Sequence, residues 1–124
     1  MQNHTRISAH VLCVIGMTLA MVAVSWAKGK EALSPAAQAG KKVFDQNCSL
    51  CHLPNQTENK IGPGLKGLFK MKELPYSHKP VTESNVQEQI EKGNAEGKPM
   101  PMPAFESKLS KADISNVIAY LKTL

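Results

Sequence analysis

The pentapeptide Cys48-Ser49-Leu50-Cys51-His52 decides how the rest of this chain is understood. Two cysteines three positions apart on a helical turn can reach the two vinyl groups of one porphyrin and form thioethers with them. The histidine that follows then lies under the centre of the ring and presents its imidazole to the iron. The pattern C-x-x-C-H therefore indicates covalent attachment of c-type haem, with Cys48, Cys51 and His52 as candidate site residues.

Three other uses of the cysteines explain the sequence less well. A zinc ion needs four ligands, and the adjacent Cys51 and His52 cannot easily both face one tetrahedral ion. A structural disulfide would suit an oxidising compartment, but it would leave His52 and the long loop after it unexplained. A thioredoxin-like redox pair is expected beside βαβ units, and no alternating strand pattern is present. We therefore prefer the haem interpretation.

The N-terminal 27 residues have the layout of a secretory signal peptide. Positions 1–10 carry one arginine and no acidic residue, and 16 residues without a charge follow. Small residues at Ser25 and Ala27 suit a signal peptidase. An uncleaved anchor is the alternative, because the apolar run is just short of the ~20 residues of a spanning helix. The predicted organisation is a signal peptide at 1–27, a short linker at 28–33 and one domain at 34–124.

The charge of the exported part is small and positive. It has fourteen lysines against ten acidic residues, no block of like charge and no tryptophan. This composition argues against nucleic-acid binding. The excess charge would either assist docking to an acidic protein partner or simply keep the protein soluble.

Two helices are predicted from their capping residues in the first two thirds of the domain. The first begins at Ser34, with a proline in the first helical position, and runs to about residue 47. Gly40 and Phe44 share one face of it, and a glycine inside a helix suggests close approach of another helix. The second helix is expected from about 83 to 92, between Thr82 as its cap and a terminating glycine.

The third helix is the most clearly marked. Ser110 and Asp113 form a capping-box pattern, and the apolar spacing typical of a core-facing helix continues to Leu121. Some 35 residues of loop, with a short helical turn near 67–70, separate the first two helices. A loop that long is unusual in a small helical bundle, so we expect it to wrap around something. The predicted class is all-α.

With these features, the chain resembles the small, soluble monohaem class I c-type cytochromes of bacteria. The resemblance spans nearly all of 34–124 and is carried by the segments GKKVF, CSLCH, IGPGLKGLF, MPAF and NVIAYLKTL. It implies a class I cytochrome c fold, with three main helices and long loops around one haem. It also implies that Cys48 and Cys51 hold this haem covalently and that His52 is the proximal iron ligand.

The resemblance assigns further roles by motif. Pro63 matches a proline whose carbonyl accepts a hydrogen bond from the proximal histidine, which fixes the orientation of the imidazole. Gly40 and Phe44 would meet Tyr120 where the first and last helices cross. Many relatives read GLFGR where this chain reads GLFKM, so any role of that arginine is absent.

The sixth iron ligand is the least determined part of the site. Candidates are Met71, Met100, Met102 and His78. Met100 and Met102 each precede a proline, which favours an extended or polyproline II backbone. Side chains two apart there point ~120° from each other, so only one sulfur can face the iron, and the residues alone do not say which. The resemblance selects Met102, because the family's ligand usually opens a motif like MPAF.

The function implied is that of a periplasmic electron carrier rather than an enzyme. With His52 and Met102 both bound, no substrate position would be open on the iron. We expect a monomer with transient redox protein partners, and membrane contact only through residues 1–27 if they remain attached. Two alternatives stay open: an electron-entry subunit tethered to a membrane redox complex, and a haem enzyme or sensor with an open sixth position.

Overall fold

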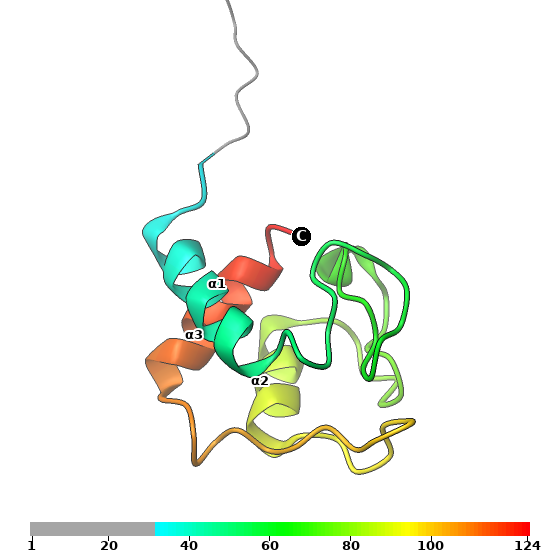
Figure 1. Ribbon diagram of the computed structural model, residues 1–124. Coiled ribbons are helices and arrows are strands. Elements are labelled where there is room, and N and C mark those ends of the chain that lie inside the picture. Colours follow the sequence, from blue (N-terminus) through cyan, green and yellow to red (C-terminus); the bar gives the residue numbers. More distant parts are fainter. Residues whose placement is uncertain (1–31) are drawn as a thin grey trace, which may run out of the picture. The chain divides into compact units, whose positions relative to one another are not determined.

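The computed structural model describes residues 32–124, which form three α-helices, a 3-10 turn and long loops (Figure 1). The predicted signal peptide at 1–27 and most of the linker at 28–33 lie outside the described residues. Within 32–124 the chain makes two isolated β-bridges and no strand, which confirms the all-α class. No helix in this range is long and apolar enough to cross a membrane. The elements are α1 (Pro35–Asn47), η1 (Leu68–Lys70), α2 (Glu83–Lys92) and α3 (Lys111–Leu121).

The helices begin where their capping residues predict. The hydroxyl of Ser34 accepts from the N–H of Ala37 at 3.2 Å, and Pro35 occupies the first turn of α1. Thr82 caps α2 by accepting from a backbone N–H at 3.1 Å. At α3, Ser110 and Asp113 make both hydrogen bonds of the capping box. Because these caps satisfy backbone donors that the helix itself leaves unpaired, local sequence fixes all three starts.

The main helix contact is the crossing of α1 and α3. A Cβ built on Gly40 would overlap the backbone carbonyl of Asn116, so only glycine allows the two backbones to approach this closely. One turn later, the rings of Phe44 and Tyr120 pack edge to face, with centroids 5.5 Å apart and an interplanar angle of 64°. This arrangement is favourable for aromatic pairs. The predicted meeting of the first and last helices is thus confirmed.

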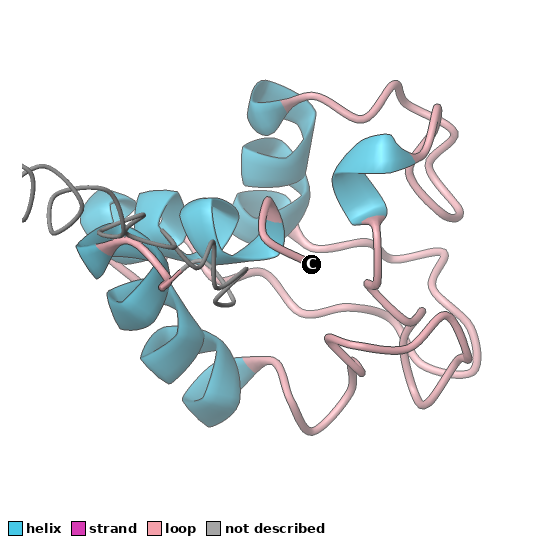
Figure 2. Cartoon of the chain, turned by 90° about the horizontal axis from the view of Figure 1, so that it is seen from above, coloured by secondary structure: helices cyan, strands magenta, loops and turns pink. Residues whose placement is uncertain are grey.

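The loops make the other half of the domain. In Figure 2 the three α-helices gather on one side, and the loops extend from them on the other. The 35-residue connection between α1 and α2 is well ordered rather than structureless. Backbone hydrogen bonds join distant parts of this connection. The N–H of Gly62 donates to the carbonyl of Cys51 at 2.8 Å, and the N–H of Leu65 donates to the carbonyl of Leu53 at 2.9 Å. Leu65, Leu68 and Leu74 anchor it in the hydrophobic core.

We predict that Gly40→Ala destabilises the protein. The added methyl group meets backbone atoms of α3, which cannot move aside without separating the helices. We expect the free energy of unfolding to fall by about 1–3 kcal/mol, despite the higher helix propensity of alanine. Chemical denaturation of the two proteins measures the difference. Gln46→Ala, at an exposed position of the same helix, is the control and should stay within about 0.5 kcal/mol.

Candidate functional site

Helices and loops together enclose one large apolar cavity. Its empty volume is about 1060 Å³, including the part that opens to solvent. All five site residues predicted from the sequence line it: Cys48, Cys51, His52, Pro63 and Met102. Met100 also lines the cavity, whereas the candidates Met71 and His78 do not. Both of the latter are exposed, with 79% of the His78 side chain accessible.

The cysteines stand at the point where α1 ends. Cys48 is the C-cap of the helix, and the turn continues through hydrogen bonds from the N–H groups of Cys51 and His52 to its carbonyl, at 3.0 and 2.9 Å. Both cysteines are half-buried free thiols. Burial, with a smaller contribution from Cys51, raises the pKa of the Cys48 thiol to about 11. The direction of this shift reflects the apolar surroundings of the Cys48 sulfur.

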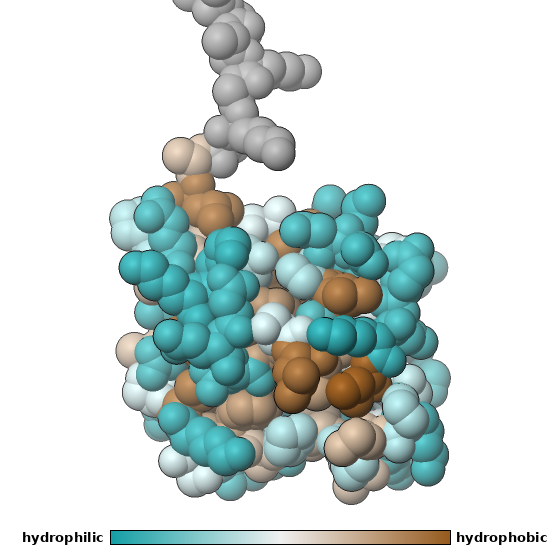
Figure 3. Space-filling view, viewed as in Figure 1, coloured by the Kyte–Doolittle hydropathy of each residue, from teal (hydrophilic) through white to brown (hydrophobic). Residues whose placement is uncertain are grey.

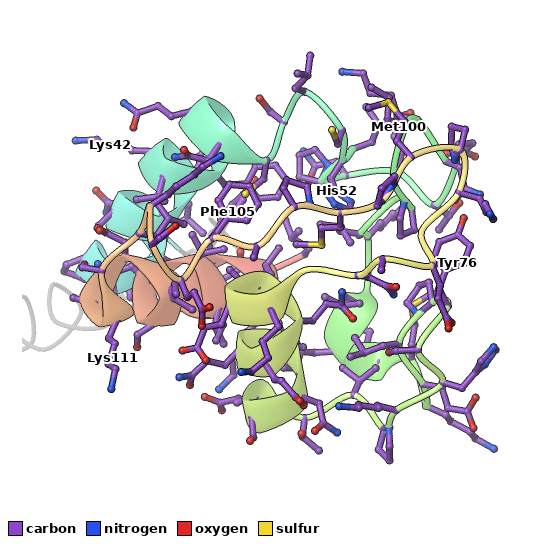
Figure 4. The ribbon with its side chains drawn as sticks, turned by 90° about the horizontal axis from the view of Figure 1, so that it is seen from below. Lys42, His52, Tyr76, Met100, Phe105 and Lys111 are labelled. Carbon is purple, nitrogen blue, oxygen red and sulfur yellow. The ribbon has the colours of Figure 1, made fainter. Side chains whose placement is uncertain are left out.

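The imidazole of His52 is fixed by a backbone carbonyl. His52 Nδ1 lies 2.9 Å from the carbonyl oxygen of Pro63. A carbonyl can only accept, so Nδ1 carries the proton and Nε2 keeps a lone pair that can bind a metal. Figure 4 shows His52 directed into the middle of the molecule, while Lys42 and Lys111 extend outward.

Gly62 makes room for that imidazole, a role that the sequence patterns did not reveal. A Cβ at Gly62 would lie 2.5 Å from His52 Cε1 and 2.9 Å from Nδ1. Any side chain there would displace the ring from its position beside the Pro63 carbonyl. The only available signal was the Gly-Pro-Gly sequence at 62–64. Such a sequence indicates that another group packs closely against the backbone, but it does not identify that group as His52.

Met102 lies far along the chain from the cysteines, and its backbone is held by Asn94. The two residues exchange backbone hydrogen bonds in both directions, each 2.9 Å long, and form an isolated antiparallel bridge. Gly93, at the end of α2, has φ of 71°, and a Cβ on it would overlap the carbonyl of Met102. The Met102 side chain is half-buried, whereas that of Met100 is 60% exposed.

Gln89 is a second residue that the sequence patterns did not reveal. It lies on α2, lines the cavity and is 3.8 Å from the sulfur of Met102 through Nε2. The same nitrogen donates to the carbonyl of Gly93 at 3.0 Å, so the amide is oriented by the end of its own helix. A polar residue next to Ile90 on the apolar side of this helix was the signal that could have identified it.

The cavity has the chemistry that a haem requires. Its wall is mostly apolar, and Cys48, Cys51, His52, Met100 and Met102 contribute two cysteine sulfurs, an imidazole and two thioethers to it. A zinc site is not supported, because residues 32–124 contain no group of three or more His, Cys, Asp or Glu side chains able to hold a metal ion. The buried hydrophobic side chains in the wall are Phe44, Leu65, Leu68, Leu74, Val86, Ile90, Phe105, Val117 and Leu121.

Comparison with known proteins identifies the family. Residues 37–124 match the cytochrome c family. A cytochrome c6 from Picosynechococcus sp. is 32% identical over 110 residues, covering 87% of this chain and 90% of the relative. A cytochrome c2 from Rhodospirillum rubrum is 34% identical over 123 residues, covering 82% and 90%.

Two further similarities extend this result. The cbb3-type cytochrome c oxidase subunit FixP of Azorhizobium caulinodans is 35% identical over 100 residues, which is 78% of this chain but only 32% of that subunit. This chain therefore spans about a third of the subunit's length. Among solved structures, cytochrome c6 from the diatom Phaeodactylum tricornutum superimposes with a TM-score of 0.52 at 31% identity, covering 68% of this chain and 88% of the diatom protein.

The family assignment agrees with the site. In this family one haem c is bound covalently through a C-x-x-C-H motif, which Cys48 and Cys51 provide here. The helical class I fold, the apolar cavity and the motif are all present in one domain. The chain is a small monohaem class I member of the cytochrome c family.

Proposed function

We propose that this protein is a periplasmic carrier of single electrons whose haem iron is bound by His52 and Met102. Electron transfer by a c-type haem is the shared activity of its relatives, and the proposal adds the ligands and the location. One observation carries it. The cavity that contains the attachment cysteines also contains an imidazole with Nε2 available and a half-buried thioether from a different segment.

The protein's own groups set the properties of the site. The haem supplies an iron that alternates between Fe(III) and Fe(II). The hydrogen bond to Pro63 keeps His52 in the tautomer with a free Nε2 and increases its basicity. A thioether is a soft, weak donor, so ligation by Met102 favours Fe(II) and raises the reduction potential. Asn94 pairs with both the N–H and the carbonyl of Met102, which restrains the backbone that carries the sulfur.

The surface around the cavity suits brief protein contacts. Leu50, between the two attachment cysteines, is 73% exposed, and Met100 at the cavity is also largely exposed. Figure 3 shows apolar atoms on the surface between α1 and the loops, among polar groups. A small apolar surface within a polar rim fits the transient, low-area contacts of redox partners. If His52 and Met102 both bind the iron, no site for a substrate would remain on it, so we infer that the protein is not an enzyme.

A second candidate function is electron entry into a membrane complex. It is favoured by the similarity to the oxidase subunit FixP together with the apolar segment in residues 1–27. The two candidates differ in the fate of that segment. Fractionation of cells that make the full chain distinguishes them: a shortened soluble form in the periplasmic extract supports the carrier, and a full-length form in the membrane fraction supports the subunit.

The ligand assignment predicts different spectra for two methionine variants. Met102→Ala should lose the weak iron–sulfur charge-transfer band completely and gain the ability to bind carbon monoxide. Met100→Ala should keep the band and remain low-spin, because Met100 is 60% exposed and we assign the ligand to Met102. Absorption spectra of the oxidised proteins, and of the reduced proteins under carbon monoxide, provide the measurement.

Met100→Ala is also the matched control, since it removes the same side chain from the same proline-rich segment. Loss of the band in Met100→Ala alone would reverse the assignment of the two methionines. A high-spin wild-type protein that binds carbon monoxide readily would contradict the carrier function itself.

The contact of Gln89 with the sulfur predicts a change in reduction potential. An N–H donated to the sulfur weakens it as a donor to Fe(III), so this contact favours the reduced state. Gln89→Leu should therefore lower the potential, by on the order of 20–40 mV for one weak hydrogen bond. Gln87→Leu, on the exposed side of α2, should leave the potential unchanged. Redox titration of both variants gives the test. An equal reduction potential in the wild type and in both variants would contradict the effect of Gln89 on the Met102 sulfur.

The contact of Gly62 with His52 predicts the effect of adding a methyl group there. Gly62→Ala should displace the imidazole, reduce the free energy of unfolding by about 1–3 kcal/mol and add a high-spin component to the spectrum. Gly67→Ala is the control. Its φ of 70° makes alanine costly, but a Cβ there comes no nearer than 3.8 Å to a neighbour, the side chain of Lys70. We expect Gly67→Ala to have a lower free energy of unfolding than the wild type and the same spectrum.

A further inference from the structure

The segment 95–101 forms a loop that is held at its base by Asn94. Besides the paired backbone bonds between Asn94 and Met102, the N–H of Glu96 donates to Asn94 Oδ1 at 2.9 Å and that of Gly97 to Asn94 O at 3.4 Å. Each of these bonds ends on Asn94. They therefore fix the two ends of the loop and leave its tip, around Lys98 and Met100, to other contacts.

The tip is poor in hydrogen bonds of its own. Two of its residues, Pro99 and Pro101, have no N–H to donate. Among residues 32–124, one hydrogen bond joins 95–101 to a segment outside the loop and its base: the hydroxyl of Tyr76 donates to the carbonyl of Lys98 at 3.2 Å. The two residues are 22 positions apart, and both line the cavity.

Tyr76 stands on a segment that is firmly attached to the rest of the fold. Just before it, Leu74 is buried in the core and its N–H donates to the carbonyl of Lys79 at 2.8 Å. The ammonium of Lys79 lies 2.6 Å from the carboxylate of Glu88 on α2. The turn around Tyr76 is thus connected to the core, to itself and to a helix, so it can serve as a fixed point for the less constrained loop.

The backbone of this turn is in an unusual conformation. Tyr76 has φ of 69° and His78 has φ of 53°, and neither is a glycine. Left-handed backbone at a non-glycine residue costs about 1–3 kcal/mol and persists only where surrounding contacts require it. At Tyr76 this conformation accompanies a side chain that lines the cavity and reaches across to Lys98. Figure 4 shows Tyr76 on the loop side of the molecule, away from Lys111 on α3.

We propose that Tyr76 is a positioning residue that latches the loop 95–101 over the cavity. Its hydroxyl holds the carbonyl of Lys98, four residues before Met102, and so restricts how far the loop can move away from the cavity. The effect on the iron rests on the proposed function, because it requires Met102 as the sixth ligand. The latch itself is a property of the polypeptide and can be measured independently of the ligand.

The test is Tyr76→Phe in the holoprotein, which removes the hydroxyl and keeps the ring. We expect the backbone amide order parameters of Lys98 and Met100, measured by NMR relaxation of the reduced protein, to fall from the rigid range toward ~0.6 or below. Those of α2 should not change. If Met102 is the ligand, imidazole should also bind the oxidised iron about 2- to 10-fold more tightly, as expected for the loss of one hydrogen bond that keeps the loop closed.

Tyr120→Phe is the matched control, since it removes the other tyrosine hydroxyl of the described chain while the ring stays packed on Phe44. It should leave the order parameters of the loop unchanged. Unchanged order parameters in Tyr76→Phe would overturn the latch, whether or not its reduction potential or imidazole affinity shifted. A more mobile loop in Tyr76→Phe alone supports the latch even if the methionine variants show that Met102 is not the ligand.

Discussion

The close contact of α1 and α3 at Gly40 is the constraint on which the other parts of the site depend. It sets the direction of α1, and with it the position of Cys48 at the end of that helix. It also places Val117 and Leu121 of α3 along the cavity wall. Because the contact joins backbone to backbone, it leaves little freedom for side chains to adjust. The attachment cysteines therefore follow directly from a fixed helix end, with Cys48 as its cap and Cys51 in the turn that continues from it.

The two segments that carry His52 and Met102 are held by a different means. His52 is oriented by the carbonyl of Pro63, Met102 by the backbone of Asn94, and the loop before Met102 by the hydroxyl of Tyr76. In each case a backbone carbonyl accepts the bond. Such acceptors belong to the main chain, so they do not depend on the identity of the side chain at the accepting residue. The helices thus supply position through packing, and the loops supply orientation through hydrogen bonds.

Local sequence signals predicted the parts of the fold that local physics controls. The three helix starts followed from Ser34, Thr82 and Ser110, because a cap acts within its own turn. The attachment motif could be recognised because bonding to one haem itself requires two cysteines three positions apart. The roles of Gln89, Asn94 and Tyr76 could not be predicted in this way, although the place of Gln89 on the apolar side of its helix was a signal. Each acts on a residue that only the tertiary fold brings near, such as Lys98, 22 positions from Tyr76. Met71 and His78 were the less favoured candidates in sequence, and the fold shows that they lie outside the cavity.

The cavity also explains how so small a domain can be stable. Of the thirteen buried hydrophobic side chains in the described residues, nine line the cavity, so most of the core is also the wall of the haem site. Without the haem in the cavity, these side chains would face an empty apolar space or water. They would then lack, on that side, the contacts that stabilise a core. A covalently attached haem stays on the unfolded chain too, so it stabilises the fold through the apolar surface that it buries against these side chains. The haem is therefore part of the hydrophobic core as well as the redox centre, and covalent attachment through Cys48 and Cys51 makes that contribution permanent.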